Sequence, residues 1–99
     1  MEIRKESRGS ELTLKVSGRL DTTTAPQLEA ALNAGLSGVR TLVFDLSELA
    51  YISSAGLRVL LAAQKTMSKQ GSMVVRHATD AVMDIFDVTG FVDILTIEK

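Results

Sequence analysis

The sequence contains no cysteine and no tryptophan, and it has one histidine and one proline among its 99 residues. Without cysteine, the chain has no disulfide framework, no thiolate metal site and no thiol nucleophile. Its 11 basic and 12 acidic residues nearly cancel, and the lack of a basic block gives little support to nucleic-acid binding. No apolar run is long enough to span a bilayer, and the charged segment 1–10 lacks the apolar centre of a signal peptide. These absences predict a cytoplasmic protein with no membrane insertion.

The residue combinations of common catalytic sites are also missing. A serine hydrolase needs a histidine base close to a Gly-x-Ser-x-Gly turn. Here Ser54 follows Ile52-Ser53, and the single histidine, His77, stands at the end of a different predicted strand. There is no glycine-rich phosphate loop, and no spacing of acidic residues suggests a metal site. We therefore expect a binding protein with no enzyme activity, no cofactor and no metal.

The stretch Thr41–Leu61 is the most informative part of the chain. Its first six residues alternate in polarity, which predicts a strand with Leu42, Phe44 and Leu46 in the core. A turn at 47–49 follows, and the apolar spacing then becomes helical. The stretch therefore predicts a strand, a turn and a helix.

The start of this helix is the segment Ser53-Ser54-Ala55-Gly56. A serine here can cap the helix, because its hydroxyl accepts a hydrogen bond from an amide that lacks an intrahelical partner. The same free amides and the helix dipole also favour a phosphate at this position. Glycine is costly in a helix, so Gly56 predicts a close approach to a neighbouring backbone. From these four residues alone, the simplest role of Ser54 is that of the N-cap.

The other elements follow from periodicity and turn signals. They are strands at 2–7, 11–17, 72–77 and 94–98, a helix that starts at Thr22–Pro26 and ends at Gly35 or Gly38, and a helix between Thr79-Asp80 and Thr89-Gly90. The order β-β-α-β-α-β-α-β predicts a single α/β domain over residues 1–99, with a mostly parallel five-stranded sheet and an antiparallel first strand. Because the outer strands alternate polar and apolar residues, we expect the helices mainly on one face.

This topology predicts where a binding site lies. Loops at the carboxyl ends of parallel strands share one edge of the sheet, so we expect a cluster of Asp21–Thr24, Ser53-Ser54 and Ala78-Thr79. The helix that begins in the cluster carries one stripe of small and basic residues: Arg58, Ala62, Lys65 and Lys69. The stripe is either an ordinary solvated face or a docking edge for a partner.

Two segments resemble a known family. The run LAYISSAGLRVLLAAQ is similar to the signature of STAS domains, and GRLDTTTA is similar to their Gly-x-Leu-Asp-x-x-Thr-Ala entry to the first helix. The resemblance is to the small bacterial anti-sigma factor antagonists of the SpoIIAA type. Aligned on Gly56-Leu57, the family's phosphorylated serine falls on Ser54. The family's preceding aspartate is replaced by Ser53, which leaves Ser53 as an alternative acceptor.

The resemblance implies a function as a protein-interaction switch. The unphosphorylated protein would bind an anti-sigma factor that is also a serine kinase and so release a sigma factor for transcription. Phosphorylation by that kinase would end the association, and a serine phosphatase would reset it. The expected partner-binding residues are Asp21, Thr22, Thr23, Thr24, Ser53, Ser54, Ala55, Arg58, Ala62 and Lys65. The alternative is a STAS signalling module with a different protein partner, or with a nucleotide or lipid in the same loop cluster.

Overall fold

The computed structural model describes residues 1–98, so that Lys99, the last residue of the predicted domain, lies outside the described residues. The strands are β1 (Glu2–Arg8), β2 (Glu11–Leu20), β3 (Thr41–Asp45), β4 (Leu49–Ile52), β5 (Ser72–Arg76) and β6 (Ile97–Glu98). The helices are α1 (Ala25–Gly35), α2 (Ser54–Gln70) and α3 (Asp80–Thr89), and a short 3-10 helix, η1 (Phe91–Asp93), follows α3.

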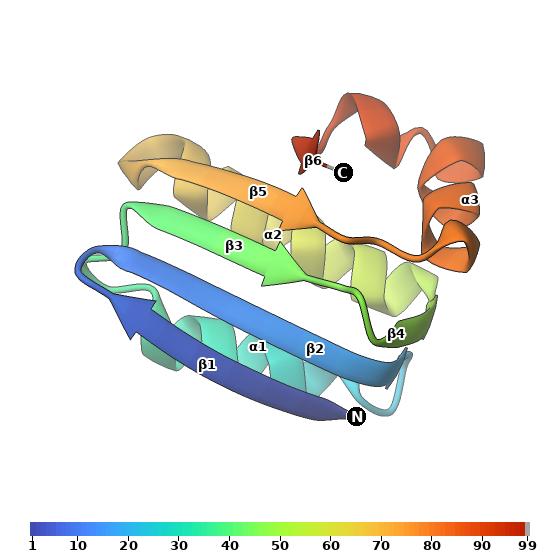
Figure 1. Cartoon of the computed structure of the whole chain (residues 1–99), viewed down its shortest axis with the longest axis horizontal. Helices are drawn as coiled ribbons and strands as arrows, with labels where there is room; N and C mark the ends of the chain where they lie inside the picture. The colour runs from blue at the N-terminus through green and yellow to red at the C-terminus, as the bar shows by residue number, and fades with distance from the viewer. Residues whose placement is uncertain (99) are drawn as a thin grey trace.

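The sheet is mostly parallel and is covered by helices on one face. Its strand order is β1-β2-β3-β5-β6, and β4 pairs with β2 outside this row. β1 is antiparallel to β2, whereas the other pairs are parallel. Figure 1 shows α1 and α2 behind the sheet and α3 beyond the carboxyl end of β5, where α3 packs on β4. The predicted α/β architecture with helices mainly on one face is therefore confirmed.

A sixth strand, β4, corrects the predicted five-stranded sheet. β2 is longer than the predicted strand 11–17: its first half pairs with β3, and Gly18–Leu20 pair with β4, with a register shift between Gly18 and Arg19. The amide of Gly18 donates to the carbonyl of Glu48 at 3.0 Å, which brings the loop after β3 alongside β2. The turn at 47–49 therefore leads into a strand and not directly into the helix. Four residues are too few for periodicity to reveal, and they become a strand only because β2 extends to meet them.

The last strand is shorter than the predicted strand 94–98. The amides of Ile94 and Leu95 both donate to the carbonyl of Phe91, at 3.0 and 2.9 Å. These bonds turn the chain back on η1, so pairing with β5 starts late: the Thr96 carbonyl accepts from the amide of Val75, and Ile97 and Glu98 are the residues of the described segment that form β6.

The core lies between the sheet and the helices. The predicted inward residues Leu42, Phe44 and Leu46 are fully buried. Val43 points to the face without helices, yet it is only 2% exposed. It lies on the central strand, between Thr13 of β2 and Val74 of β5, so the neighbouring strands cover it. No helix within residues 1–98 is both long and apolar enough to cross a membrane.

Candidate functional site

Ser53 is the N-cap of α2. Its backbone is extended, with φ −96° and ψ 176°, and its side-chain oxygen accepts from the amide of Gly56 at 3.5 Å. Its own amide donates to the carbonyl of Leu20 at 2.8 Å. Ser53 thus fixes the start of α2 against the end of β2, and the N-cap role that the four-residue segment alone suggested for Ser54 belongs to Ser53.

Ser54 is the first residue of α2, and its side chain is exposed. Within residues 1–98, we find no hydrogen bond from its hydroxyl to another residue. The two neighbouring hydroxyls therefore differ: that of Ser53 is half-buried and used in the cap, whereas that of Ser54 is free and faces solvent.

Gly56 allows the start of α2 to lie close to the ends of two strands. A Cβ at this position would be 2.7 Å from Cγ of Leu20 and 2.8 Å from Cγ1 of Ile52. The close neighbours are side chains of β2 and β4, not the neighbouring backbone that the sequence suggested. Any larger residue at position 56 must displace Leu20 or Ile52, and Ser54 would shift with the helix start.

The loop Asp21–Thr24 folds around one carboxylate. Oδ1 of Asp21 accepts from the hydroxyl and the amide of Thr23, at 2.7 and 3.0 Å, and from the amide of Thr24 at 3.2 Å. The Thr24 hydroxyl donates to the carbonyl of Arg19 at 2.8 Å and accepts from the amide of Asp21 at the same distance. The hydrogen bonds that the Asp21 carboxylate accepts, above all the one from the Thr23 hydroxyl, hold the pKa of Asp21 below its ordinary value. A charged, ordered loop thus precedes α1.

A shallow groove runs between α1 and α2. Its first part has a volume of about 230 Å³ and is lined by Thr22, Pro26, Glu29, Ala55, Arg58 and their neighbours. The second part, about 120 Å³, shares Glu29 and Val59 with the first and continues along α2 to Ala62 and Thr66. The groove therefore begins one residue from Ser54.

The predicted stripe on α2 is exposed along its whole length. Arg58, Ala62, Lys65 and Lys69 are all open to solvent. Ala62 lines the groove, whereas the two lysines lie further along the same helix outside its lining. Among the predicted partner-binding residues, the structure thus brings Thr22, Ala55 and Arg58 to one hollow beside Ser54.

Thr79 lies away from the start of α2. Its hydroxyl donates to the carbonyl of Leu49 at 3.1 Å and accepts from the amide of Val82 at 3.3 Å, so it caps α3 and ties that helix to the first residue of β4. Ser53 follows the last residue of β4. The length of β4 therefore separates Ala78-Thr79 from the other two segments of the expected cluster.

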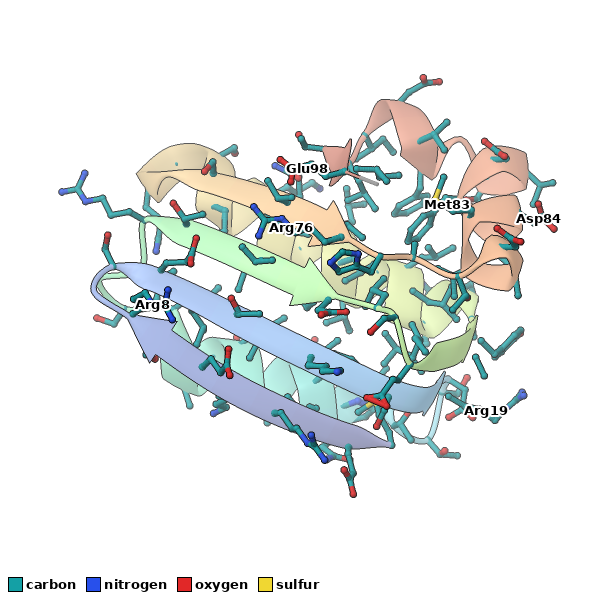
Figure 2. All side chains as sticks on the ribbon, in the orientation of Figure 1. Arg8, Arg19, Arg76, Met83, Asp84 and Glu98 are labelled. Carbon is teal, nitrogen blue, oxygen red and sulfur yellow. The ribbon has the colours of Figure 1, made fainter. Side chains whose placement is uncertain are left out.

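Arg19 and Tyr51 are neighbours of the site that the sequence alone does not reveal. The guanidinium of Arg19 lies 4.4 Å from the centre of the Tyr51 ring, and its Nε lies 3.9 Å from Oδ2 of Asp21. Tyr51 is 36% exposed, and Figure 2 shows Arg19 projecting at the end of β2. Only the pairing of β2 with β4 places these two side chains together, so the missed strand hid them.

The remaining polar candidates do not form a second site. His77 is exposed after β5 and has a left-handed backbone, with φ 59°. Asp84 and Asp87 lie on the exposed face of α3. The described part of the chain holds no group of three or more His, Cys, Asp or Glu residues suited to a metal ion.

Comparison with known proteins identifies the family. A family model described as "Mlab, STAS domain" matches residues 3–96, which is nearly the whole chain. The chain belongs to the STAS family, and the resemblance inferred from its two motifs is confirmed.

The relatives agree with this assignment. The chain is 40% identical over 84 residues to BtrV of Bordetella bronchiseptica, a protein provisionally named as an anti-sigma factor antagonist, covering 83% of this chain and 72% of that protein. It is 32% identical over 98 residues to the anti-sigma-B factor antagonist of Listeria monocytogenes, covering 96% of this chain and 85% of the relative.

Solved structures show the same fold. An anti-sigma factor antagonist from Mycobacterium paratuberculosis has a TM-score of 0.88 at 28% identity, covering 97% of this chain and 83% of the other. The unphosphorylated form of the anti-sigma factor antagonist SpoIIAA has a TM-score of 0.77 at 14% identity, covering 99% and 88%. The second match supports the fold alone.

Proposed function

We propose that this protein is an anti-sigma factor antagonist whose binding is controlled by phosphorylation of Ser54. The observation that carries the proposal is the position of the Ser54 hydroxyl: exposed, free of the helix cap, and beside the groove between α1 and α2. The names of the Listeria and Mycobacterium relatives support the class of partner. The expected partner is an anti-sigma factor that is also a serine kinase.

The unphosphorylated protein presents a neutral helix start to its partner. Asp21–Thr24 and the start of α2 form one end of the proposed contact, and the exposed α2 residues Arg58, Ala62 and Lys65 continue it. The small side chains of Ala55 and Ala62 let a partner approach the helix closely. Association would remove the anti-sigma factor from its sigma factor.

Phosphorylation would change this surface without unfolding the domain. A phosphate adds about 1.5 to 2 negative charges near neutral pH. At the start of a helix that charge is compatible with the fold, because the helix dipole and free amides favour an anion there. Within a close protein contact the same charge must be desolvated or repelled. Release of the partner would follow, and a serine phosphatase would restore binding.

A small-molecule function has less support from the geometry. Sites for drug-sized ligands have volumes of roughly 300–1,000 Å³. The two parts of the groove together only reach the lower end of this range, at about 230 and 120 Å³, and both are shallow and open to solvent. A groove of this kind suits a protein surface better than an enclosed nucleotide or lipid.

A displacement assay tests the proposed function. A complex of the organism's anti-sigma factor kinase with its sigma factor is mixed with the unmodified protein, and free sigma factor is measured. We expect release by the unmodified protein and none by the phosphorylated protein. If neither form binds the anti-sigma factor, the partner belongs to a different signalling assembly.

A further inference from the structure

β1 is the edge strand of the sheet, and its outer side has no neighbour within residues 1–98. The strand has seven residues and no proline, and it is exposed except for the half-buried Ile3. Figure 1 shows it as a long straight strand at the lower margin of the sheet. Its free amides and carbonyls are a template for pairing with another strand.

The charges of β1 alternate in sign along one face. Since Leu12, Leu14 and Val16 face the helices, their neighbours Thr13, Lys15 and Ser17 face the open side of the sheet. The cross-strand register of β1 with β2 places four charged residues on this open side: Glu2, Arg4, Glu6 and Arg8. None of the four makes an ion pair within residues 1–98, and Arg4 lies directly opposite Lys15, a like charge.

We propose that β1 pairs antiparallel with β1 of a second copy of this chain, with the twofold axis at Lys5. In this register Glu2 lies opposite the second copy's Arg8, and Arg4 lies opposite its Glu6. Symmetry repeats both contacts, so four cross-strand pairs of opposite charge form on the open face. Cross-strand pairs of opposite charge stabilise a sheet, and like pairs destabilise it.

The alternating charges select this register over its neighbours. In a twofold pair the open faces of both copies lie on the same side of the sheet. The register can therefore shift only by two residues at a time, which moves the centre of the pair from one residue to the next. Centring the pair on Arg4 places Glu2 against Glu6 and Arg4 against itself. Centring it on Glu6 places Arg4 against Arg8 and Glu6 against itself. Both shifts replace attraction with repulsion. Centring the pair on Ile3 or on Ser7 keeps opposite charges together but forms only two such pairs, whereas the Lys5 centre forms four over the full length of the strand.

One contact opposes the pairing. Lys5 lies opposite its own counterpart, on the helix side of the strand. Its side chain is exposed, so the two long stems can diverge and keep their ammonium groups apart in water. The contact predicts a weak dimer, which Lys5→Thr should tighten.

The dimer would leave the proposed partner site open. Figure 1 places β1 at one margin of the sheet, α1 behind β1 and β2, and α2 behind β3 and β5. Two copies joined at β1 would form one continuous sheet that carries two α2 helices. The pairing therefore adds a second docking face without covering Ser54.

A charge-swap experiment tests the pairing. Sedimentation of the untagged chain, from micromolar to millimolar concentration, should show a reversible monomer–dimer equilibrium. Glu6→Arg alone and Arg4→Glu alone should each weaken self-association by at least about tenfold, because two attractive pairs become repulsive. An equimolar mixture of the two variants should restore the dimer, and so should the double variant R4E/E6R.

Dilution of the wild-type chain gives a second measurement that needs no variant. Amide NMR shifts should change with concentration for residues 2–8 and not for α2. A wild-type chain that stays monomeric at millimolar concentration would overturn the proposal and leave the charges as protection against edge aggregation. Single variants that associate like the wild type, or a mixture that fails to restore the dimer, would overturn it as well.

Discussion

At the scale of single residues, two adjacent serines have different surroundings. The Ser53 hydroxyl caps α2 and the Ser53 amide donates to Leu20 at the end of β2, whereas Ser54 keeps a free, exposed hydroxyl. The motif around Gly56 aligns the family's phosphorylated serine with Ser54, but the sequence did not show which of the two serines caps the helix. That assignment depends on the backbone angles of Ser53.

The first prediction concerns the phosphoacceptor. With the partner kinase and ATP, intact mass should rise by one phosphate for the wild type and for Ser53→Ala, and should not rise for Ser54→Ala. Ser53→Ala should lose about 0.5–2 kcal/mol of stability, because the cap is removed. A folded Ser53→Ala protein that escapes phosphorylation would show that Ser53 is the acceptor.

The second prediction concerns Asp21 and pH. Its folded-state pKa is lower than the ordinary value of 3.8, so the folded protein binds fewer protons than the unfolded chain just below that pH. The stabilisation is complete above the unfolded pKa and is lost as pH falls through the folded pKa. Melting temperatures measured from neutral to acid pH should therefore fall less steeply below pH 4 for Asp21→Asn than for the wild type. If the melting temperatures of the two proteins fall equally steeply below pH 4, the hydrogen bonds of the loop do not stabilise the Asp21 carboxylate as the structure indicates.

At the scale of elements, the sequence predicted the three helices and most of the strands, because each has a clear period or cap. It missed β4 and overextended the last strand, since both depend on contacts between distant segments. β4 exists because β2 continues past β3, and η1 withdraws residues 94 and 95 from the sheet. The same long-range contacts hid Arg19 and Tyr51, whereas the α2 stripe could be predicted from local spacing.

The third prediction tests how α2 packs. Gly56→Ala should destabilise the domain by about 1–3 kcal/mol through overpacking against Leu20 and Ile52, although alanine favours a helix by about 1 kcal/mol. Gly35→Ala is the matched control: its nearest atom would be Leu12 Cδ2 at 3.7 Å, an ordinary contact. Thermal melting should separate the two variants. Equal stability would mean that α2 can move away from the strand ends at little cost.

The fourth prediction tests the basic stripe of α2. Lys65→Glu, alone and with Lys69→Glu, should mainly slow association with the partner and change its dependence on salt. Arg40→Glu, just before β3, produces the same change in net charge as Lys65→Glu. Arg40 lies beside the end of α2 that is remote from Ser54, where its carbonyl accepts from the amide of Ser72, and the variant should have a smaller effect. Stopped-flow association at low and high salt measures both. Unchanged rates at low salt for the lysine variants would make the stripe an ordinary solvated face.

At the scale of the whole molecule, the surface proposed for partner binding is separate from the core that holds the fold together. The core lies between the sheet and the helices, while the proposed contact lies on the outer surface of α2 and the adjoining loops. A charge added at Ser54 therefore acts on an exposed surface and not on the packing of the domain. An anion at a helix start is worth roughly 0.3–1 kcal/mol in favour of the helix.

The fifth prediction gives the size of the switch. An unpaired charge buried in a protein contact costs on the order of 2–5 kcal/mol, which corresponds to roughly 30-fold to several thousand-fold weaker binding. Ser54→Asp is an imperfect mimic of the phosphate. It should lose most of its partner binding and keep a melting temperature near that of the wild type.

The most direct test is the partner affinity of the unmodified protein and of protein phosphorylated at Ser54, measured by calorimetry alongside their melting temperatures. We predict at least about 30-fold weaker binding for the phosphorylated form, with a melting temperature equal to or slightly above that of the unmodified form. Equal affinity of two folded forms would contradict a charge switch at Ser54. A loss of affinity that follows a loss of folding would contradict the claim that binding and folding are separate.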